Sequence, residues 1–294
     1  MSRISDWVRE EFKKGDDQRD AGLTTPENIV RVDDIIYGDD SRQQSLDVYR
    51  PKSREGELLP VIVNVHGGGW VYGDKERYQY YAMDLSQRGF AVVNFSYRLA
   101  PEHTFPAPLE DTNSVFTWIL SHAEEYRFNL GQVFAVGDSA GANILALYSC
   151  MCTNPDYAAM FSFVPPTGFA PRAVALNCGV YELEMGKSDF IHDLAAEYLP
   201  GGLTEEGIHS VSVTNFITKA FPPAFVMTSV DDPFKTQGLF LAEKLCRAEV
   251  PFVFRFCGDC DNRLPHVFHL NIRSRDARLC NDEECAFFRS LSNG

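Results

Sequence analysis

The chain has 294 residues, of which 45% are hydrophobic, and its formal net charge at pH 7 is −14. This length suits one large domain with a sizeable core, and the acidic balance argues against nucleic acid and anionic membranes as partners. Neither a signal peptide nor a membrane-spanning apolar run is evident, so we expect a cytoplasmic protein without stable membrane association and with reduced cysteines.

Secondary structure is predicted from hydrophobic periodicity along the chain. Ile4, Trp7, Val8 and Phe12 recur at helical spacing and indicate a short amphipathic helix near the N-terminus. Apolar, β-branched runs predict strands around residues 32–37, 46–49, 61–65, 91–97, 132–136, 173–177, 224–229 and 252–256. Helical patterns cover residues 111–122, 142–148, 190–198 and 238–248, and residues 281–284 (Asn-Asp-Glu-Glu) resemble a capping box that would open the last helix.

Strands that alternate with helices indicate an α/β fold with a mostly parallel central sheet and helices on both faces. Residues 181–220 interrupt this alternation and are too long for an ordinary connection. We interpret them as a small helical cap over the strand ends, packed with the N-terminal helix. The prediction is therefore one domain over residues 1–294, with cap elements at about 1–25 and 181–220.

Two glycine-rich motifs follow predicted buried strands. Residues 137–141 read Gly-Asp-Ser-Ala-Gly, a G-x-S-x-G elbow that lifts the hydroxyl of Ser139 out of a sharp turn. Residues 66–69 read His-Gly-Gly-Gly, a turn that offers backbone N–H groups to an oxyanion. Both motifs lie at the carboxyl ends of strands, where open α/β sheets build their sites. In the alternative interpretation the glycines only form tight turns and Ser139 only caps a helix.

A serine nucleophile needs a base, and the base needs an orienting carboxylate. Asp231 and Asp232 follow the strand at 224–229, and Pro233 pushes residue 232 into an extended conformation, which favours Asp232 as the acid. His266 and His269 both follow the last predicted strand, as the base of this fold does. The residues alone leave the choice between these two histidines open.

Cysteines 257 and 260 have C-x-x-C spacing, and Cys280 and Cys285 follow. A zinc site or a local disulfide is conceivable from this spacing. Four residues separate the second pair, however, and no thioredoxin-like unit precedes the first. We therefore expect unpaired thiols and no metal.

The chain resembles the hormone-sensitive-lipase-like family of α/β-hydrolase carboxylesterases over about residues 40–292. The resemblance rests on five segments: His-Gly-Gly-Gly-Trp at 66–70, Tyr-Arg-Leu-Ala-Pro-Glu at 97–102, Gly-Asp-Ser-Ala-Gly at 137–141, Asp-Pro-Phe at 232–234 and His-Val-Phe at 266–268. It implies an α/β-hydrolase fold and supports Asp232 and His266 over their neighbours. The oxyanion donors that it implies are the N–H groups of Gly67, Gly68 and Ala140. Arg98 and Glu102 are expected to form a structural ion pair near the site.

The expected function is a serine carboxylic-ester hydrolase for short-chain acyl esters, with a small-molecule ester as substrate and no cofactor. Ser139 would attack, His266 would take its proton and Asp232 would hold the imidazole. Trp70 and Tyr72 are expected to line the substrate pocket, and an exposed edge strand could support a homodimer. The alternatives are a non-catalytic small-ligand-binding protein, whose usual mark is loss of a triad residue, and an amidase or peptidase.

Overall fold

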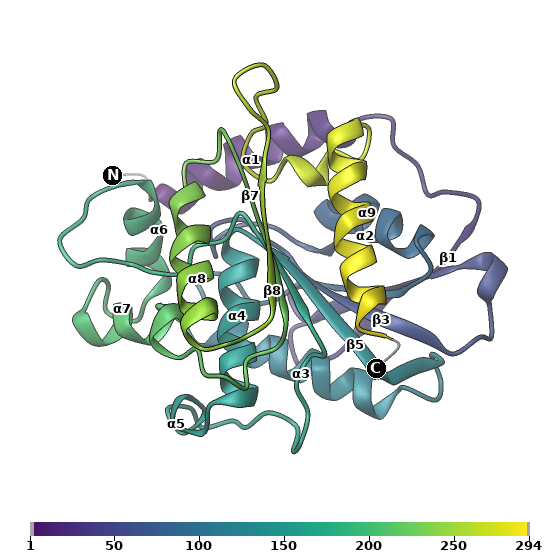
Figure 1. Cartoon of the computed structure of the whole chain (residues 1–294), viewed down its shortest axis with the longest axis horizontal. Coiled ribbons are helices and arrows are strands. Elements are labelled where there is room, and N and C mark those ends of the chain that lie inside the picture. The colour runs from purple at the N-terminus through teal and green to yellow at the C-terminus, as the bar shows by residue number, and fades with distance from the viewer. Residues whose placement is uncertain (1–2, 293–294) are drawn as a thin grey trace.

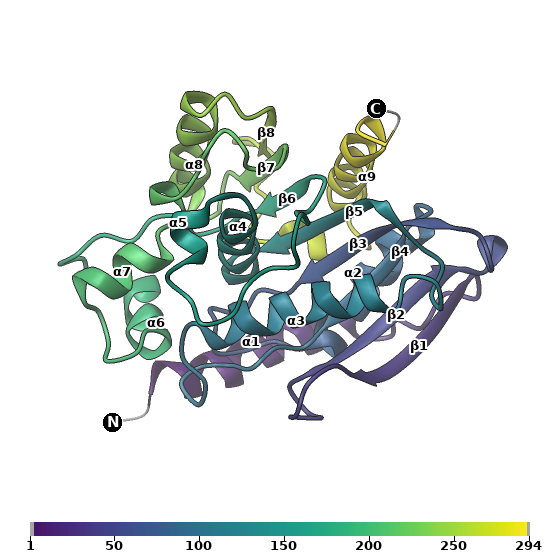
Figure 2. The same ribbon diagram turned by 90° about the horizontal axis from the view of Figure 1, so that it is seen from below.

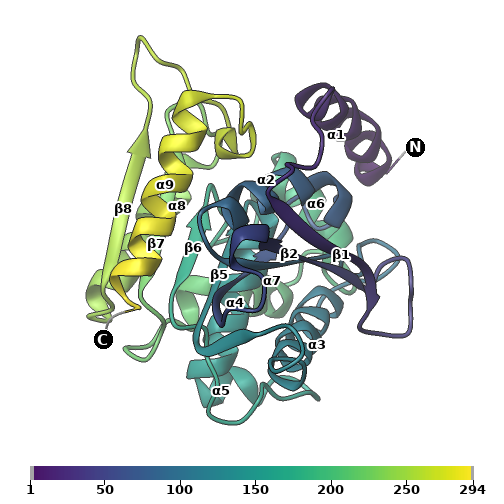
Figure 3. The ribbon, with the colours of Figure 1, turned by 90° about the vertical axis from the view of Figure 1, so that its right-hand side faces the viewer.

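A computed structural model describes residues 3–292 of the chain. Within that range an eight-stranded sheet has the order β1-β2-β4-β3-β5-β6-β7-β8, and only the β1–β2 and β2–β4 pairs are antiparallel. The strands are β1 (Ile29–Ile36), β2 (Ser45–Pro51), β3 (Leu59–Val65), β4 (Ala91–Phe95), β5 (Phe128–Asp138), β6 (Val174–Asn177), β7 (Ala224–Ser229) and β8 (Phe252–Cys257). The sheet twists strongly between β8 and β1 (Figure 3).

Helices cover both faces of the sheet (Figure 1). Helices α2 and α9 pack on one face, where Phe134 of β5 stacks on Phe288 of α9, and α3, α4 and α8 pack on the other. The helices are α1 (Ile4–Asp20), α2 (Lys75–Gln87), α3 (Ala107–Ser121), α4 (Ala140–Thr153), α5 (Pro155–Ala158), α6 (Phe190–Tyr198), α7 (Glu205–Val211), α8 (Lys235–Arg247) and α9 (Arg275–Ser290), with short 3₁₀ turns η1 (Lys52–Arg54), η2 (Val213–Asn215) and η3 (Phe268–Leu270). The fold class is therefore the predicted one.

Most of the inner strands are buried along nearly their whole length because both faces of the sheet are covered. Every residue of β4, β6 and β7 is buried, and so is every residue of β3 after Pro60. β8 forms one edge of the sheet. Pairing with a second copy through such an edge stays a prediction.

The predicted start of the last helix is wrong. Helix α9 begins at Arg275, so Asn281 and Glu284 lie in its middle on the buried side. The Asn281 amide donates to Asp84 of α2 (3.1 Å), and the Glu284 carboxylate accepts from Tyr81 of the same helix (3.2 Å). These polar residues resemble a cap in the sequence, but they form a buried network between two helices.

The segment 181–220 contains α6 and α7, and α1 packs against α6 (Figure 2). Trp7 and Phe190 meet edge to face with ring centroids 5.9 Å apart. The Asn143 amide of α4 donates to the carbonyl group of Val180, which precedes α6, and to that of Val211, which ends α7 (3.0 Å each). The interpretation of both segments as a cap stays a prediction. Residues 1–2 of the predicted cap lie outside the described residues.

Arg98 and Glu102 do not pair with each other as the resemblance implied. Arg98 binds Asp111 and Glu110 of α3, whereas Glu102 accepts from Arg9 of α1 (2.9 Å). The loop after β4 is thus tied on one side to the helix layer and on the other to α1. Among the described helices, none has the length and apolar character needed to cross a membrane.

Candidate active site

Ser139 stands at the sharp turn between β5 and α4. Its backbone has φ +50°, a left-handed conformation that is costly for a residue with a side chain and is typical of nucleophile elbows. The turn can be this tight because Gly141 has no side chain. A Cβ at that position would lie only 2.1 Å from the carbonyl oxygen of Val65 in β3.

Asp232 and His266 reach Ser139 from two other loops. Asp232 follows β7 and His266 follows β8, so all three side chains gather at the carboxyl ends of strands. The Ser139 hydroxyl lies 3.0 Å from Nε2 of His266, and Nδ1 of the same ring lies 2.9 Å from Oδ1 of Asp232. With the ring proton on Nδ1, the imidazole donates to the carboxylate and Nε2 can accept from the hydroxyl.

Asp232 is buried and nevertheless held in its ionised form. Burial alone would raise the pKa of its carboxyl group, but the hydrogen bond and the charge of His266 lower it, as do two further donors. These are the backbone N–H of Phe234 to Oδ1 (2.8 Å) and the hydroxyl of Thr228 to Oδ2 (2.8 Å). The net pKa lies below the ordinary value, so the carboxylate can stabilise a cationic imidazole.

The neighbouring candidates of the sequence lie elsewhere. Asp231 points to the surface and accepts from the guanidinium of Arg263 (2.9 Å). His269 is fully buried, and neither ring nitrogen has a hydrogen-bond partner among residues 3–292. Burial lowers the pKa of His269 to about 3, so this ring stays neutral. The structure brings together Ser139, Asp232 and His266 and leaves both neighbours out.

Two of the three predicted oxyanion donors are available. The N–H groups of Gly68 and Ala140 have no acceptor within the described part of the chain, and Ala140 opens α4, where the helix dipole strengthens its donor. Gly68 has φ +117°, and a Cβ there would lie 2.1 Å from the carbonyl oxygen of Tyr72. The N–H of Gly67 instead donates to the hydroxyl of Tyr78 (2.9 Å).

Tyr78 and Asp138 belong to the site but were not predicted from the sequence. The Tyr78 hydroxyl donates to Oδ2 of Asp138 (2.8 Å), and burial raises the pKa of that carboxyl group to about 7. Asp138 is the variable residue of the G-x-S-x-G motif, which is a signal that could have found it. Tyr78 lies on α2, a helix that the periodicity analysis did not predict.

A cavity of about 290 Å³ opens beside Ser139. Its wall includes Tyr72, whose hydroxyl donates to Asp16 of α1 (2.8 Å). Trp70, the other predicted lining residue, does not reach the cavity, because its buried ring stacks on Tyr198 of α6 at 4.9 Å. The lining residues are Glu11, Phe12, Gly15, Asp16, Arg19, Gly67, Gly68, Tyr72, Tyr78, Asp138, Ser139, His266, Val267 and Leu270.

The C-x-x-C segment lies outside this arrangement. Cys257 ends β8 and Cys260 is exposed in the following loop, and neither forms a disulfide. Cys257 packs against the buried cluster that includes Cys280 of α9. The segment therefore contributes no group to the cavity wall.

Comparison with known proteins identifies the family of the chain. The family model described as BD-FAE matches residues 46–245. The chain belongs to the BD-FAE family. The segment matched to BD-FAE contains the glycine turn, the Ser139 elbow and Asp232, and it ends before His266.

Individual relatives agree with this assignment. Carboxylesterase NlhH of Mycobacterium tuberculosis is 30% identical over 201 residues, which are 65% of this chain and 62% of NlhH. The chain thus spans less than two thirds of the length of this curated relative. Arylacetamide deacetylase of Bos taurus is 34% identical over 42% of this chain and 31% of its own length. With the BD-FAE match, these relatives confirm the resemblance to the hormone-sensitive-lipase-like carboxylesterases.

Solved structures confirm the fold. Esterase B from Lactobacillus Rhamnosis (HN001) superposes with a TM-score of 0.88 over 99% of this chain and 95% of its own, at 23% sequence identity. An esterase from Pyrobaculum calidifontis superposes with a TM-score of 0.78 at 24% identity, over 99% of this chain and 95% of its own. The prediction of an α/β-hydrolase fold for this chain is therefore confirmed.

Proposed function

We propose that the chain is a serine carboxylic-ester hydrolase that acts on short-chain acyl esters. The observation that carries this proposal is the unbroken hydrogen-bonded series from Ser139 through His266 to Asp232. A serine hydroxyl becomes an effective nucleophile only when a base accepts its proton and a carboxylate orients that base. The carboxylesterase names of the relatives support the same chemistry.

In the proposed acylation step, Ser139 Oγ attacks the acyl carbon of the ester and its proton passes to His266 Nε2. Asp232 stabilises the resulting imidazolium through the bond to Nδ1. The negative charge on the former carbonyl oxygen is stabilised by the N–H groups of Gly68 and Ala140. Gly67, the third donor implied by the resemblance, contributes by holding the turn through Tyr78. The tetrahedral intermediate then collapses, and the leaving alcohol takes the proton from Nε2.

Deacylation repeats these roles with water as the nucleophile. His266 Nε2 takes a proton from a water molecule, and the resulting hydroxide forms a bond to the acyl carbon. Collapse of the second intermediate returns the proton to Ser139 Oγ and releases the carboxylic acid. Both steps use only protons and electron pairs of the ester, water and these side chains.

A preference for short acyl chains is supported by the size of the cavity. A volume of about 290 Å³ is at the small end of ligand sites, so one small group fits beside Ser139. A solved structure of Esterase B, which shares the fold, is described as inhibited by a tributyrin phosphonate. We infer that α1 and residues 181–220 act as a cap, since α1 contributes Phe12, Asp16 and Arg19 to the wall.

Amides form a second candidate substrate class. The observation that favours them is the name of one relative, arylacetamide deacetylase, which matches 42% of this chain. The same nucleophile, base and oxyanion donors could cleave an amide, provided that His266 protonates the leaving amine. Comparing an aryl acetate with the corresponding aryl acetamide would decide between the two classes.

The test of the proposed function is hydrolysis of p-nitrophenyl esters from acetate to decanoate by the wild type and by Ser139→Ala. We expect turnover that peaks at short chains and falls by about 10⁴–10⁶ in kcat in the variant. Ser149→Ala is the matched control, because Ser149 lies on α4 and only donates to the Leu145 carbonyl (2.8 Å). Normal turnover by Ser139→Ala, after contaminating esterases are excluded, would refute the proposal.

A further inference from the structure

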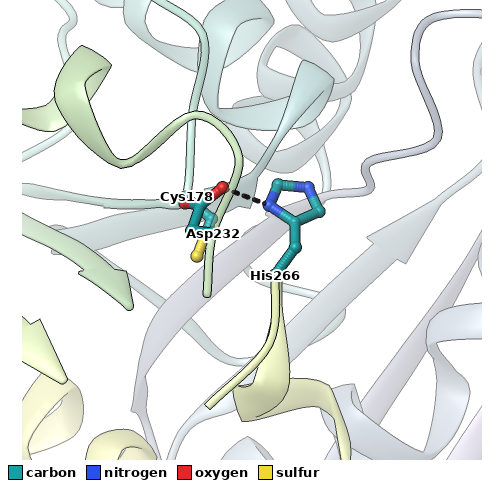
Figure 4. A group of neighbouring side chains, drawn as sticks. All are labelled: Cys178, Asp232 and His266. Carbon is teal, nitrogen blue, oxygen red and sulfur yellow. Dashed lines mark hydrogen bonds and ion pairs between the residues drawn. The ribbon is translucent and has the colours of Figure 1, made fainter. Parts of the chain in front are cut away.

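A third side chain lies against the Asp232–His266 pair. The Sγ atom of Cys178, a carboxylate oxygen of Asp232 and a ring nitrogen of His266 all lie within 4.8 Å of one another (Figure 4). Cys178 follows β6, Asp232 follows β7 and His266 follows β8, so the cluster spans three neighbouring parallel strands. These residues lie at the carboxyl ends of the strands, as Ser139 does.

Cys178 occupies this position at a conformational cost. Its φ is +49°, in the left-handed region where glycine or asparagine is the easier residue. Its N–H is fixed by the Met227 carbonyl oxygen of β7 (2.6 Å), and its side chain is buried. The thiol donates to Met227 Sδ (4.0 Å), and its sulfur lies within 4.8 Å of an Asp232 carboxylate oxygen. The Cys178 sulfur has no role in the proposed ester hydrolysis.

The three groups form a mixed sulfur, nitrogen and oxygen donor set. Such sets bind Zn²⁺ and the softer Cd²⁺ well, because thiolate favours soft cations and imidazole suits both ions. With zinc bonds of about 2.0–2.3 Å, neighbouring ligand atoms lie roughly 3.3–3.6 Å apart around a tetrahedral ion. The Nδ1–Oδ1 separation of 2.9 Å therefore has to widen by only a few tenths of an ångström.

We propose that Cys178, Asp232 and His266 form an inhibitory binding site for a thiophilic divalent cation such as Zn²⁺ or Cd²⁺. The inhibition rests on the proposed esterase function, whereas the binding does not. The cation would insert between Nδ1 of His266 and the Asp232 carboxylate, with the Cys178 sulfur as its third protein ligand. Water would complete a tetrahedral coordination sphere.

Binding would block the base by moving two protons. The cation takes the Cys178 sulfur as thiolate, and the thiol proton leaves to solvent. It takes the lone pair of His266 Nδ1, so the proton formerly on Nδ1 moves to Nε2 and the ring stays neutral. A protonated Nε2 cannot accept the proton of Ser139, and no atom changes its oxidation state. The cation is thus an inhibitor and takes no part in the proposed reaction.

Solvent reaches this cluster through His266. The side chain of His266 is 26% exposed, while that of Asp232 is fully buried and Cys178 is buried beside it. His266 also lines the cavity beside Ser139. An ion that enters the cavity can therefore reach the carboxylate and the thiol when the imidazole ring swings aside.

The experiment compares Cd²⁺ binding and Cd²⁺ inhibition in four proteins: wild type, Cys178→Ala, Cys260→Ser and the double variant. The Cys260 variant is included because the exposed group Asp259, Cys260 and Asp261 is a competing place for the ion. Binding is followed by the ultraviolet cadmium–thiolate charge-transfer band, which needs no activity. Inhibition is followed with p-nitrophenyl butyrate, and Mg²⁺ is the hard-cation control that should not inhibit.

We expect Cys178→Ala to weaken Cd²⁺ inhibition by more than about tenfold, the lower end of what even an outer-shell partner contributes to metal affinity. Cys260→Ser should leave the inhibition constant unchanged. Equal inhibition of the wild type and Cys178→Ala would overturn the proposal. Cys178→Ser keeps the size of the side chain and replaces the alanine variant if that one does not fold. A thiolate band that depends on Cys178 in a protein without esterase activity would support the binding site and refute the proposed function.

Discussion

The hydroxyl of Tyr78 lies 2.8 Å from Oδ2 of Asp138 and donates to that buried carboxyl group. The Tyr78 hydroxyl oxygen also accepts the N–H of Gly67 (2.9 Å), so one hydroxyl connects the glycine turn with the Ser139 elbow. A Cβ on Gly67 would lie 2.5 Å from Asp138 Oδ2, which shows how closely the two motifs approach. The oxyanion donors and the nucleophile are thus held at a fixed separation by a residue from α2.

The Tyr78→Phe variant tests this connection. Removing the hydroxyl leaves the Gly67 N–H and the Asp138 carboxyl group without a partner, at a cost of about 1–3 kcal/mol in the free energy of unfolding. The turn then loses its fixed position, and we expect kcat to fall between about tenfold and 100-fold with KM nearly unchanged. The measurements are ester kinetics, urea unfolding and the affinity of a boronic-acid transition-state analogue.

Tyr80→Phe is the matched control for that variant. Tyr80 lies two residues further along α2 and donates to the Leu23 carbonyl (2.9 Å), away from the elbow. Loss of the Tyr80 hydroxyl should lower the free energy of unfolding without changing kcat or the affinity for the analogue. If Tyr78→Phe loses stability but keeps the affinity of the wild type for the analogue, Tyr78 has no positioning role.

The two adjacent aspartates provide a second comparison. Asp232→Asn should lower kcat by about 10⁴, because an amide no longer fixes the proton of His266 on Nδ1. Asp231→Asn removes only a surface ion pair with Arg263, so we expect kcat to stay within about twofold of the wild type. Steady-state kinetics on one short ester decides the matter. A large loss of kcat in Asp231→Asn, with near-normal turnover in Asp232→Asn, would exchange the two assignments.

Much of the fold and of the candidate site could be predicted from the sequence, because both depend on local patterns. Buried strands are mostly apolar runs, and the motifs around Ser139 and Gly67 require glycine wherever backbones approach closely. The role of Pro233 is equally local, since it restricts the conformation of Asp232 directly. These features need no knowledge of which segments meet in space.

The parts that could not be predicted depend on contacts between distant segments. Asn281 resembles a helix cap in the sequence, but in the fold its amide donates to Asp84 of α2. Trp70 follows the glycine turn, yet the ring of Tyr198 in α6 takes it into the core instead of the cavity. Tyr78 lies on a helix with mixed polarity, and its function depends on Asp138, sixty residues later.

Tyr72 and Trp70 should differ in their effect on substrate binding. Tyr72 lines the cavity and its hydroxyl donates to Asp16 Oδ2, so Tyr72→Phe changes the wall and removes one donor from a carboxylate that still pairs with Arg19. We expect KM for short esters to change by about threefold to tenfold in Tyr72→Phe, roughly the free energy of one hydrogen bond. Trp70→Phe loses stacking on Tyr198 and should lower the melting temperature with KM unchanged. A larger KM effect from Trp70→Phe would return Trp70 to the substrate pocket.

Glu284 makes the stability of the chain depend on pH in a defined direction. Burial raises the pKa of this carboxyl group to about 7, well above its ordinary value, although Asn177 and Tyr81 donate hydrogen bonds to it. Between about pH 4.5 and 7 the folded chain therefore keeps a proton on Glu284 that the unfolded chain has released. The contribution of this group to the free energy of unfolding falls as the pH rises through that range and is constant above it.

Glu284→Gln removes this titration while keeping the size of the side chain. Relative to the wild type, the variant should gain stability between pH 5 and pH 8, by up to about 3 kcal/mol if the whole pKa shift is expressed. Asp138 titrates in both proteins, and its charge is one of the causes that raise the pKa of Glu284. Glu243→Gln, which alters an exposed pair with Arg247, should show the same difference from the wild type at both pH values. Urea unfolding at pH 5 and pH 8 measures these differences, and a Glu284→Gln difference that does not change with pH would show that Glu284 is ionised in the folded chain throughout.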